Sequence, residues 1–154
     1  AIKHHIKISI EDDPEYYKKF SEQLEELIRE NEEKWDELVQ LLLNLRDNIE
    51  TDHQKQAKDL GLTQTQLSFY NILIAEMGGD KNINEVEAKK IIEVVRSLVQ
   101  MLEESTKIDG FFQKWDEQNR VQRDIKRDII ENFDESFAPP IIERFMDLAK
   151  VKFN

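Results

Sequence analysis

Apolar residues recur along most of this chain at intervals of three and four, the spacing that places side chains on one face of an α-helix. The longest such row runs through residues 17–49 and passes through polar Asn31. We therefore expect a break near residues 31–33 and two helices, the second of which continues through His53 towards Lys58. The row fits a coiled-coil seam or one face of a bundle, and the amphipathic segments that follow favour a bundle.

Start and stop signals divide the remainder of the chain into further helices. Most starts carry a side chain that can cap a helix, or a proline in the first turn: Asp13 before Pro14, Thr63 with Gln66, Asn84 with Glu87, Asp116, and Pro139 with Pro140. Gly61 and the Gly78–Gly79 pair mark stops. These signals predict helices over 64–77, from 85 to about 105, over 116–133 and over 141–151, with an irregular stretch at 105–115.

A different pattern precedes the first helix. Ile6, Ile8 and Ile10 alternate with polar residues, which is typical of a short β-strand. A lone strand needs a partner, so it would pair with chain upstream of Ala1 or with a second copy. The sequence therefore predicts a lead-in strand at 1–10 from a truncated upstream region.

Residues 11–154 are expected to form a single helical domain, a C-terminal fragment of a larger protein. The predicted fold is mainly α: a helical bundle of about six helices with one short N-terminal strand. The composition agrees, because the chain is 36% charged and has only four Gly and three Pro. The helical spacing predicts a core that contains Leu24, Leu27, Leu38, Leu42, Leu45, Leu67, Tyr70, Ile74, Val95, Leu98, Ile125 and Ile129.

Charge and cysteine content narrow the functional classes. The net charge of −11 disfavours DNA binding by this chain alone, since phosphate backbones repel an acidic module. The chain has no cysteine, which excludes thiolate metal sites and suits a reducing cytosol. No apolar run approaches the ~20 residues of a membrane span, so we expect a cytoplasmic protein with no membrane partner.

Catalytic motifs are imitated but not formed. Asp80 followed by Glu87 and Lys89 copies the order of acids and lysine in a Mg²⁺-dependent nuclease, yet that chemistry needs a strand where a helix is predicted. No phosphate-binding loop of the G-x-x-x-x-G-K-[ST] type occurs. His4, His5 and His53 lack metal-site spacing and are expected at solvated or edge positions. No catalytic, cofactor-binding or metal-binding residue is therefore predicted.

The candidate interface is a row of cations beside aromatic residues. Arg120, Arg123 and Arg127 share one helical face, with Lys126 adjacent. Pairing with acidic neighbours on the same helix is the favoured explanation, and a docking face for an acidic partner or a DNA backbone is the other. Trp115, like the phenylalanines at 111 and 112, is either a core residue, which we favour, or an exposed interface anchor.

Two long segments carry a family resemblance. They are LGLTQTQLSFYNILI at 60–74 and KIDGFFQKWDEQNRVQRDIKRDIIENF at 107–133, preceded by EDDPEYYKKFSEQLEELI at 11–28. In spacing and residue type they resemble the C-terminal helical region of the R (restriction) subunit of type I restriction–modification enzymes. The resemblance covers nearly the whole chain and contains no catalytic signature.

The resemblance implies a larger machine. The full-length protein would be an ATP-dependent type I site-specific deoxyribonuclease that uses ATP and Mg²⁺, whereas this fragment would hold no cofactor. Its helical region would tie the motor to a methyltransferase core of M and S subunits and would contact DNA through the full complex, only weakly by itself. Acidic departures from the family pattern at Glu131, Asp134 and Glu135 disfavour direct DNA contact. The alternative is a free-standing helical scaffold or dimerisation module that pairs through residues 17–49.

Overall fold

The computed structural model describes residues 13–30, 34–79 and 83–153, and within them six α-helices form. They are α2 (Pro14–Glu30), α3 (Trp35–Leu60), α4 (Gln64–Glu76), α5 (Glu85–Thr106), α6 (Trp115–Asn132) and α7 (Ala138–Phe153). Two 3-10 turns, η2 (Phe111–Gln113) and η3 (Glu135–Phe137), precede α6 and α7. The mainly helical bundle is confirmed. The strand predicted at 1–10, with His4 and His5, lies outside the described residues.

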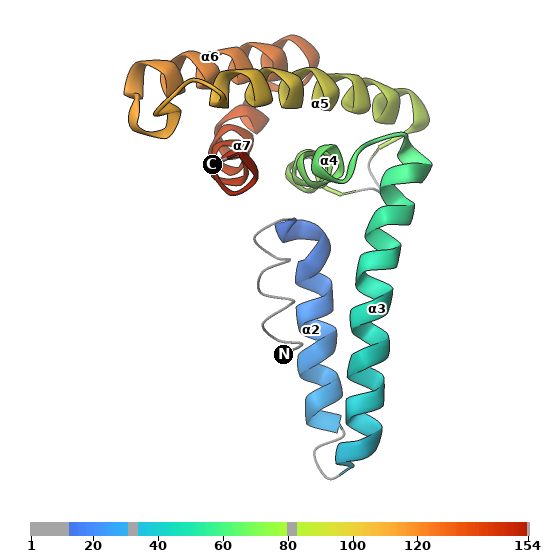
Figure 1. Cartoon of the computed structure of the whole chain (residues 1–154). Helices are drawn as coiled ribbons and strands as arrows, with labels where there is room; N and C mark the ends of the chain where they lie inside the picture. Colours follow the sequence, from blue (N-terminus) through green and yellow to red (C-terminus); the bar gives the residue numbers. More distant parts are fainter. Residues whose placement is uncertain (1–12, 31–33, 80–82, 154) are drawn as a thin grey trace.

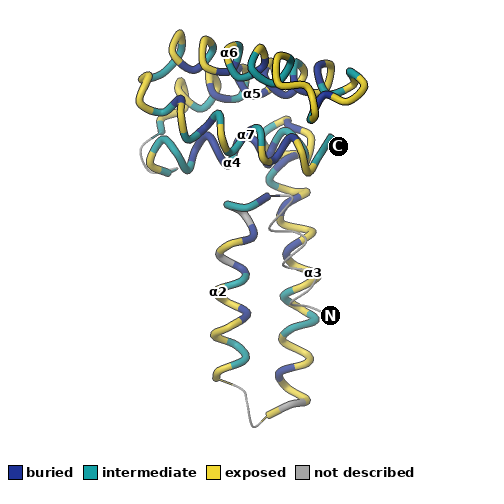
Figure 2. The backbone as a smooth tube through the Cα atoms, turned by 90° about the vertical axis from the view of Figure 1, so that its left-hand side faces the viewer, coloured by how far each residue is buried: buried dark blue, intermediate teal, exposed yellow. Residues whose placement is uncertain are grey.

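The helices form a body and a projecting arm (Figure 1). We call the α2–α3 hairpin the arm and the helices α4 to α7 the body. In the body, α5 and α6 form the layer farthest from the arm, and α4 and α7 lie between that layer and the arm (Figures 1 and 2). Both arm helices pack against α4. None of the described helices is long and apolar enough to cross a membrane.

Two hydrophobic clusters correspond to these two parts. The larger fills the body, and the smaller consists of Tyr17, Phe20, Leu24 and Ile49 between the arm helices. The 17–49 row is therefore buried by pairing α2 with α3 rather than by the core of the body.

Most of the predicted core is buried, with one systematic correction. Leu27, Leu42 and Leu45 in the arm are half-buried. A pair of helices leaves the flanks of each contact row open to water, whereas a helix in the body has neighbours on more sides. Figure 2 shows this difference as a predominance of exposed positions along the arm.

Local capping chemistry sets most helix boundaries as predicted. Gly61 adopts φ 70°, a left-handed conformation that ends α3. A reciprocal capping box starts α4: the Gln66 N–H donates to Thr63 Oγ1 (3.1 Å), and the Thr63 N–H donates to Gln66 Oε1 (3.0 Å). The Glu87 N–H likewise donates to the Asn84 side chain at the start of α5 (2.9 Å).

Asp116 does not cap a helix, contrary to the prediction. The helix α6 begins one residue earlier, at Trp115, and its N-cap residue Lys114 makes no side-chain capping hydrogen bond. Asp116 lies instead in the first turn of α6, where an acidic side chain still interacts favourably with the helix dipole.

A buried polar cluster joins the arm to the body, and we call it the arm joint. Asp13 and His53 are 0% and 4% exposed, and His53 Nε2 lies 2.8 Å from Asp13 Oδ2. Asn71 of α4 donates from Nδ2 to the same Asp13 oxygen (3.1 Å), and the Tyr17 ring stacks on His53. The prediction that His53 is solvated was therefore wrong. Position 53 belongs to the inner face of α3, where it meets the start of α2.

Ion pairs of Arg144 reinforce this connection. Arg144 of α7 pairs with Glu76 at the end of α4 (2.9 Å between Nη1 and Oε1) and with Glu15 in the first turn of α2. One guanidinium thus links the arm to two helices of the body, as its fork of donors allows.

Candidate functional site

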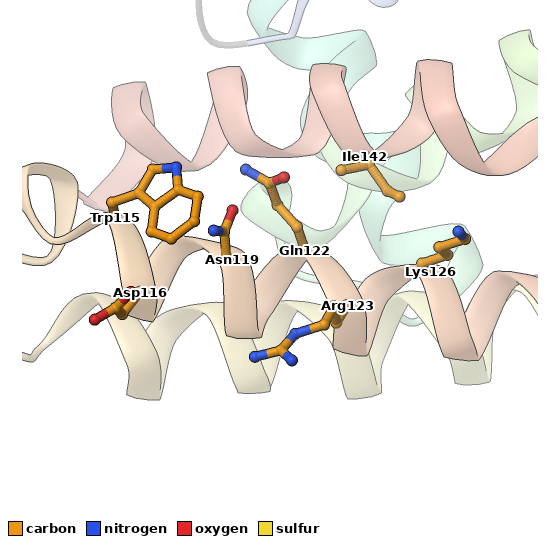
Figure 3. Close-up of a pocket in the computed structure, with 7 residues that line it drawn as sticks. All are labelled: Trp115, Asp116, Asn119, Gln122, Arg123, Lys126 and Ile142. Atoms are coloured by element: carbon orange, nitrogen blue, oxygen red, sulfur yellow. The ribbon is translucent and has the colours of Figure 1, made fainter.

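A groove runs between α6 and α7 on the surface of the body. Its larger hollow has a volume of about 520 Å³ and is lined, as Figure 3 shows, by Trp115, Asp116, Asn119, Gln122, Arg123, Lys126 and Ile142. A second hollow of about 330 Å³ shares Lys126 and Ile142 with the first and continues to Ile130, Glu135, Ala138 and Pro139. We call the two hollows together the α6–α7 groove.

The periodicity of α6 explains why these side chains meet there. Val121, Ile125 and Ile129 form its fully buried stripe against the body. The groove residues at positions 115, 119, 122 and 126 are spaced by three or four residues and therefore share a neighbouring face of α6, which turns towards α7. One side of α6 therefore packs the core while the adjacent side lines the groove.

Trp115 is an exposed aromatic residue at one end of the groove. Trp115 is 74% exposed, so the favoured prediction that it lies in the core was wrong. Phe111 is the residue that enters the core, and Phe112 is half-buried beside it, with the two rings edge to face at 5.0 Å between centroids. Lys114 is extended and separates η2 from α6, so the two segments present their aromatic residues to different sides.

The three arginines of the predicted row have different surroundings in the structure. Arg120 pairs with Glu117 (2.9 Å) and Arg127 with Asp124 (3.5 Å), each within α6, so intrahelical pairing is confirmed for these two. Arg123 lines the groove and takes part in no ion pair among the described residues. Of the four predicted interface residues, Trp115 and Arg123 line the groove, whereas Arg120 and Arg127 are not part of its lining.

Lys126 is the cation of the groove lining that the predicted site set omitted. It lines both hollows and, within the part of the chain that the structure describes, has no ion-pair partner. Its position three residues after Arg123 already suggested in the sequence that it lies near that residue. The predicted set followed the row of arginines from Arg120 and therefore left Lys126 out. Together Arg123 and Lys126 make the middle of the groove positive.

Charges on α6 are segregated around its axis. Apart from Asp116, the acidic residues of α6 do not line the groove. Among them, burial raises the pKa of Asp128 above its ordinary value, while neighbouring Arg127 opposes that rise. Within the groove lining, acids occur only near the two ends, as Asp116 and Glu135. The groove is therefore cationic at its centre and acidic at its ends.

Comparison with known proteins identifies the family. Residues 1–145 match the model of the family described as type I restriction enzyme HindI endonuclease subunit-like, C-terminal. The chain belongs to this family. The resemblance found in the sequence is confirmed at that level.

A curated relative agrees with this assignment to the C-terminal endonuclease-subunit family. The putative type I restriction enzyme MjaIXP endonuclease subunit of Methanocaldococcus jannaschii is 27% identical over 124 residues. The match covers 79% of this chain and 11% of that protein, so the chain spans only a small part of its relative. No solved structure matches the chain.

The side chains of the groove can be set beside the catalytic motifs that the sequence imitates. Among the described residues, no group of three or more His, Asp or Glu side chains could hold a metal ion. Glu87 and Lys89, two members of the nuclease-like order in the sequence, lie in the first turns of α5, and the third, Asp80, lies outside the described residues. An exposed tryptophan, two cations without ion-pair partners and side-chain amides are the groups that the groove offers to a partner.

Proposed function

We propose that this chain is the C-terminal helical assembly domain of a type I restriction endonuclease subunit. In this proposal it couples the ATP-dependent translocase and nuclease of that subunit to a methyltransferase core of M and S subunits in the cytoplasm. ATP and Mg²⁺ would be bound by other parts of the same subunit. Membership of the C-terminal endonuclease-subunit family over residues 1–145 supports this assignment most strongly.

The α6–α7 groove is the surface that we propose for docking. Tryptophan and arginine are enriched at the energetic centres of protein interfaces, and the groove exposes Trp115 beside Arg123. Arg120 and Arg127 lie on the adjoining face of α6, where each pairs with an acidic residue of the same helix, and they lie outside the proposed docking surface.

Direct DNA binding has a minor place in the proposal. A net charge of −11 opposes approach to a phosphate backbone. Among the described residues, the groove lining holds two cations without an ion-pair partner, Arg123 and Lys126. DNA would therefore be held through the full complex and only weakly by this chain.

Charge reversal in the groove is expected to weaken docking strongly. In the intact endonuclease subunit, Arg123→Glu combined with Lys126→Glu should weaken assembly with the methyltransferase core at least about tenfold, because repulsion replaces attraction at the centre of the interface. Assembly would be measured by biolayer interferometry, with circular dichroism to verify helicity. The matched control is Arg120→Glu with Arg127→Glu, which makes the same charge change on the same helix outside the groove.

Two results would count against this docking face. Wild-type affinity in the groove variant would exclude the groove, and a loss confined to the control would move the interface to the outer face of α6. The alternative function, a free-standing scaffold or dimerisation module, has less support. Its 17–49 row is packed within the arm as far as the structure describes it, and the exposed apolar side chains found there flank the row, such as Val39 and Leu41, each 40% exposed.

A further inference from the structure

We infer that the α6–α7 groove receives a single α-helix of the partner protein, acidic at its centre and apolar on the side that faces Trp115. The inference deepens the proposed docking function, on which it rests, by naming the kind of segment that enters the groove. Its support is the shape of the groove, the order of its charges and the position of its apolar side chains.

The shape fits a helix. The groove lies between α6 and the first turns of α7, two helices that pack against each other. The channel between two packed helices is a place where a third helix can lay its side chains. Along α6 the lining extends from Trp115 to Ile130. At the α-helical rise this corresponds to about 22 Å, the length of about four turns of a bound helix.

The charges select an acidic centre. Arg123 and Lys126 occupy the middle of the lining and have no ion-pair partner among the described residues, while Asp116 and Glu135 stand near opposite ends. In Figure 3 Lys126 turns towards Ile142, whereas the Arg123 guanidinium turns to the side of α6 away from α7. A helix with carboxylates in its central turns would therefore meet Lys126 in the groove and Arg123 at its edge, and would keep its ends clear of both acids. Arg123 could hold a carboxylate through two parallel hydrogen bonds, a geometry that its planar guanidinium favours.

Side-chain amides add adaptable polar contacts. Asn119 and Gln122 lie between Trp115 and the cations, and no hydrogen bond to their side chains is found within the described part of the chain. Each amide can both donate and accept, so each suits a polar side chain on an incoming helix.

Apolar side chains provide the anchors. Trp115 is 74% exposed at one end and Ile130 is 41% exposed towards the other, with half-buried Ile142 of α7 between them. A partner helix with apolar residues at every third or fourth position would cover all three. A DNA backbone would pair with the cations but would leave these apolar surfaces uncovered, so the lining favours a protein segment.

A pair of peptides tests the inference on this chain. Both would be blocked, stapled helices of about 15 residues, long enough to span the groove, with the same apolar row. One would carry Glu at its central polar positions and the other Lys. Fluorescence anisotropy should show the Glu peptide binding at least about tenfold more tightly than the Lys peptide.

Variants of the chain assign that preference to the groove. Arg123→Glu with Lys126→Glu should reverse the order of the two peptides, and Arg120→Glu with Arg127→Glu should leave it unchanged. Trp115→Ala should weaken both peptides to a similar degree. If the double Glu variant misfolds by circular dichroism, Arg123→Gln with Lys126→Gln serves instead and should abolish the preference without reversing it.

The possible failures are distinguishable. Equal binding of the two peptides, an order that the groove variants do not change, or tighter binding of a 20-base-pair duplex than of the Glu peptide would overturn the acidic-helix inference. If the groove variant then still lost assembly with the methyltransferase core, the proposed docking function would stand with a different occupant. If the Glu peptide behaved as expected but the groove variant assembled with the methyltransferase core at wild-type affinity, the inference would hold and the proposed docking function would be wrong.

Discussion

Replacement of Phe69 by alanine is expected to lower the free energy of unfolding by about 3–5 kcal/mol, the largest effect of any single change considered for this chain. Phe69 of α4 is fully buried in the body. Its ring packs edge to face on Phe145 (5.0 Å between centroids) and in parallel with Phe153 (6.2 Å), both from α7. Alanine would leave a cavity between these two helices.

Urea unfolding followed by circular dichroism measures this loss. Phe112→Ala is the matched control, because the same atoms are removed from a half-buried side chain near η2. The control should lose clearly less stability than the Phe69 variant. Equal losses at the two positions would show that Phe69 does not hold α4 and α7 together.

Replacement of Asp13 by alanine is expected to loosen the arm and to cost about 3 kcal/mol. Asp13 Oδ2 lies within hydrogen-bond distance of buried His53 Nε2 (2.8 Å) and of half-buried Asn71 Nδ2 (3.1 Å). Its removal leaves the buried His53 on α3 and the half-buried Asn71 on α4 without this partner, at roughly 1–3 kcal/mol for each unsatisfied buried group. The loss falls where the arm meets the body.

Hydrogen exchange can localise the effect of the Asp13 variant. Amides of α2 and α3 should exchange faster, while those of α5 and α6 keep their protection, since the body has its own hydrophobic cluster. Glu22→Ala, an exposed acid-to-alanine change on α2, serves as the control and should change neither region. Unaltered protection of the arm in the Asp13 variant would contradict the role of the arm joint.

Features encoded locally were predictable from the sequence. The capping box at Thr63, the cap at Asn84 and the stop at Gly61 depend on residues within a few positions of one another. The apolar rows likewise gave the helices and most of the core, because helical spacing determines which side chains share a face. The family resemblance depended on two such local segments and was confirmed.

Features that depend on long-range contacts were not predictable in this way. Periodicity shows that a helix face is buried but does not show which element covers it. The two-helix arm could therefore not be distinguished from one face of a bundle. The contact between Asp13 and His53 joins residues forty positions apart and has no local signal. The candidate site was found only in part for the same reason: spacing placed Arg120, Arg123 and Arg127 together, and only the packing of α6 on α7 separates Arg123 from the other two.

Site-specific photocrosslinking tests the docking surface most directly. The photoreactive residue p-benzoylphenylalanine would replace Trp115 in the intact endonuclease subunit, which would then be assembled with the methyltransferase core and irradiated. The control places the same residue at Val86, an equally exposed apolar position on α5. We expect crosslinks to the M or S subunit from position 115 and none from position 86. Crosslinks from position 86 alone, or from neither position in an assembled complex, would contradict docking through the α6–α7 groove.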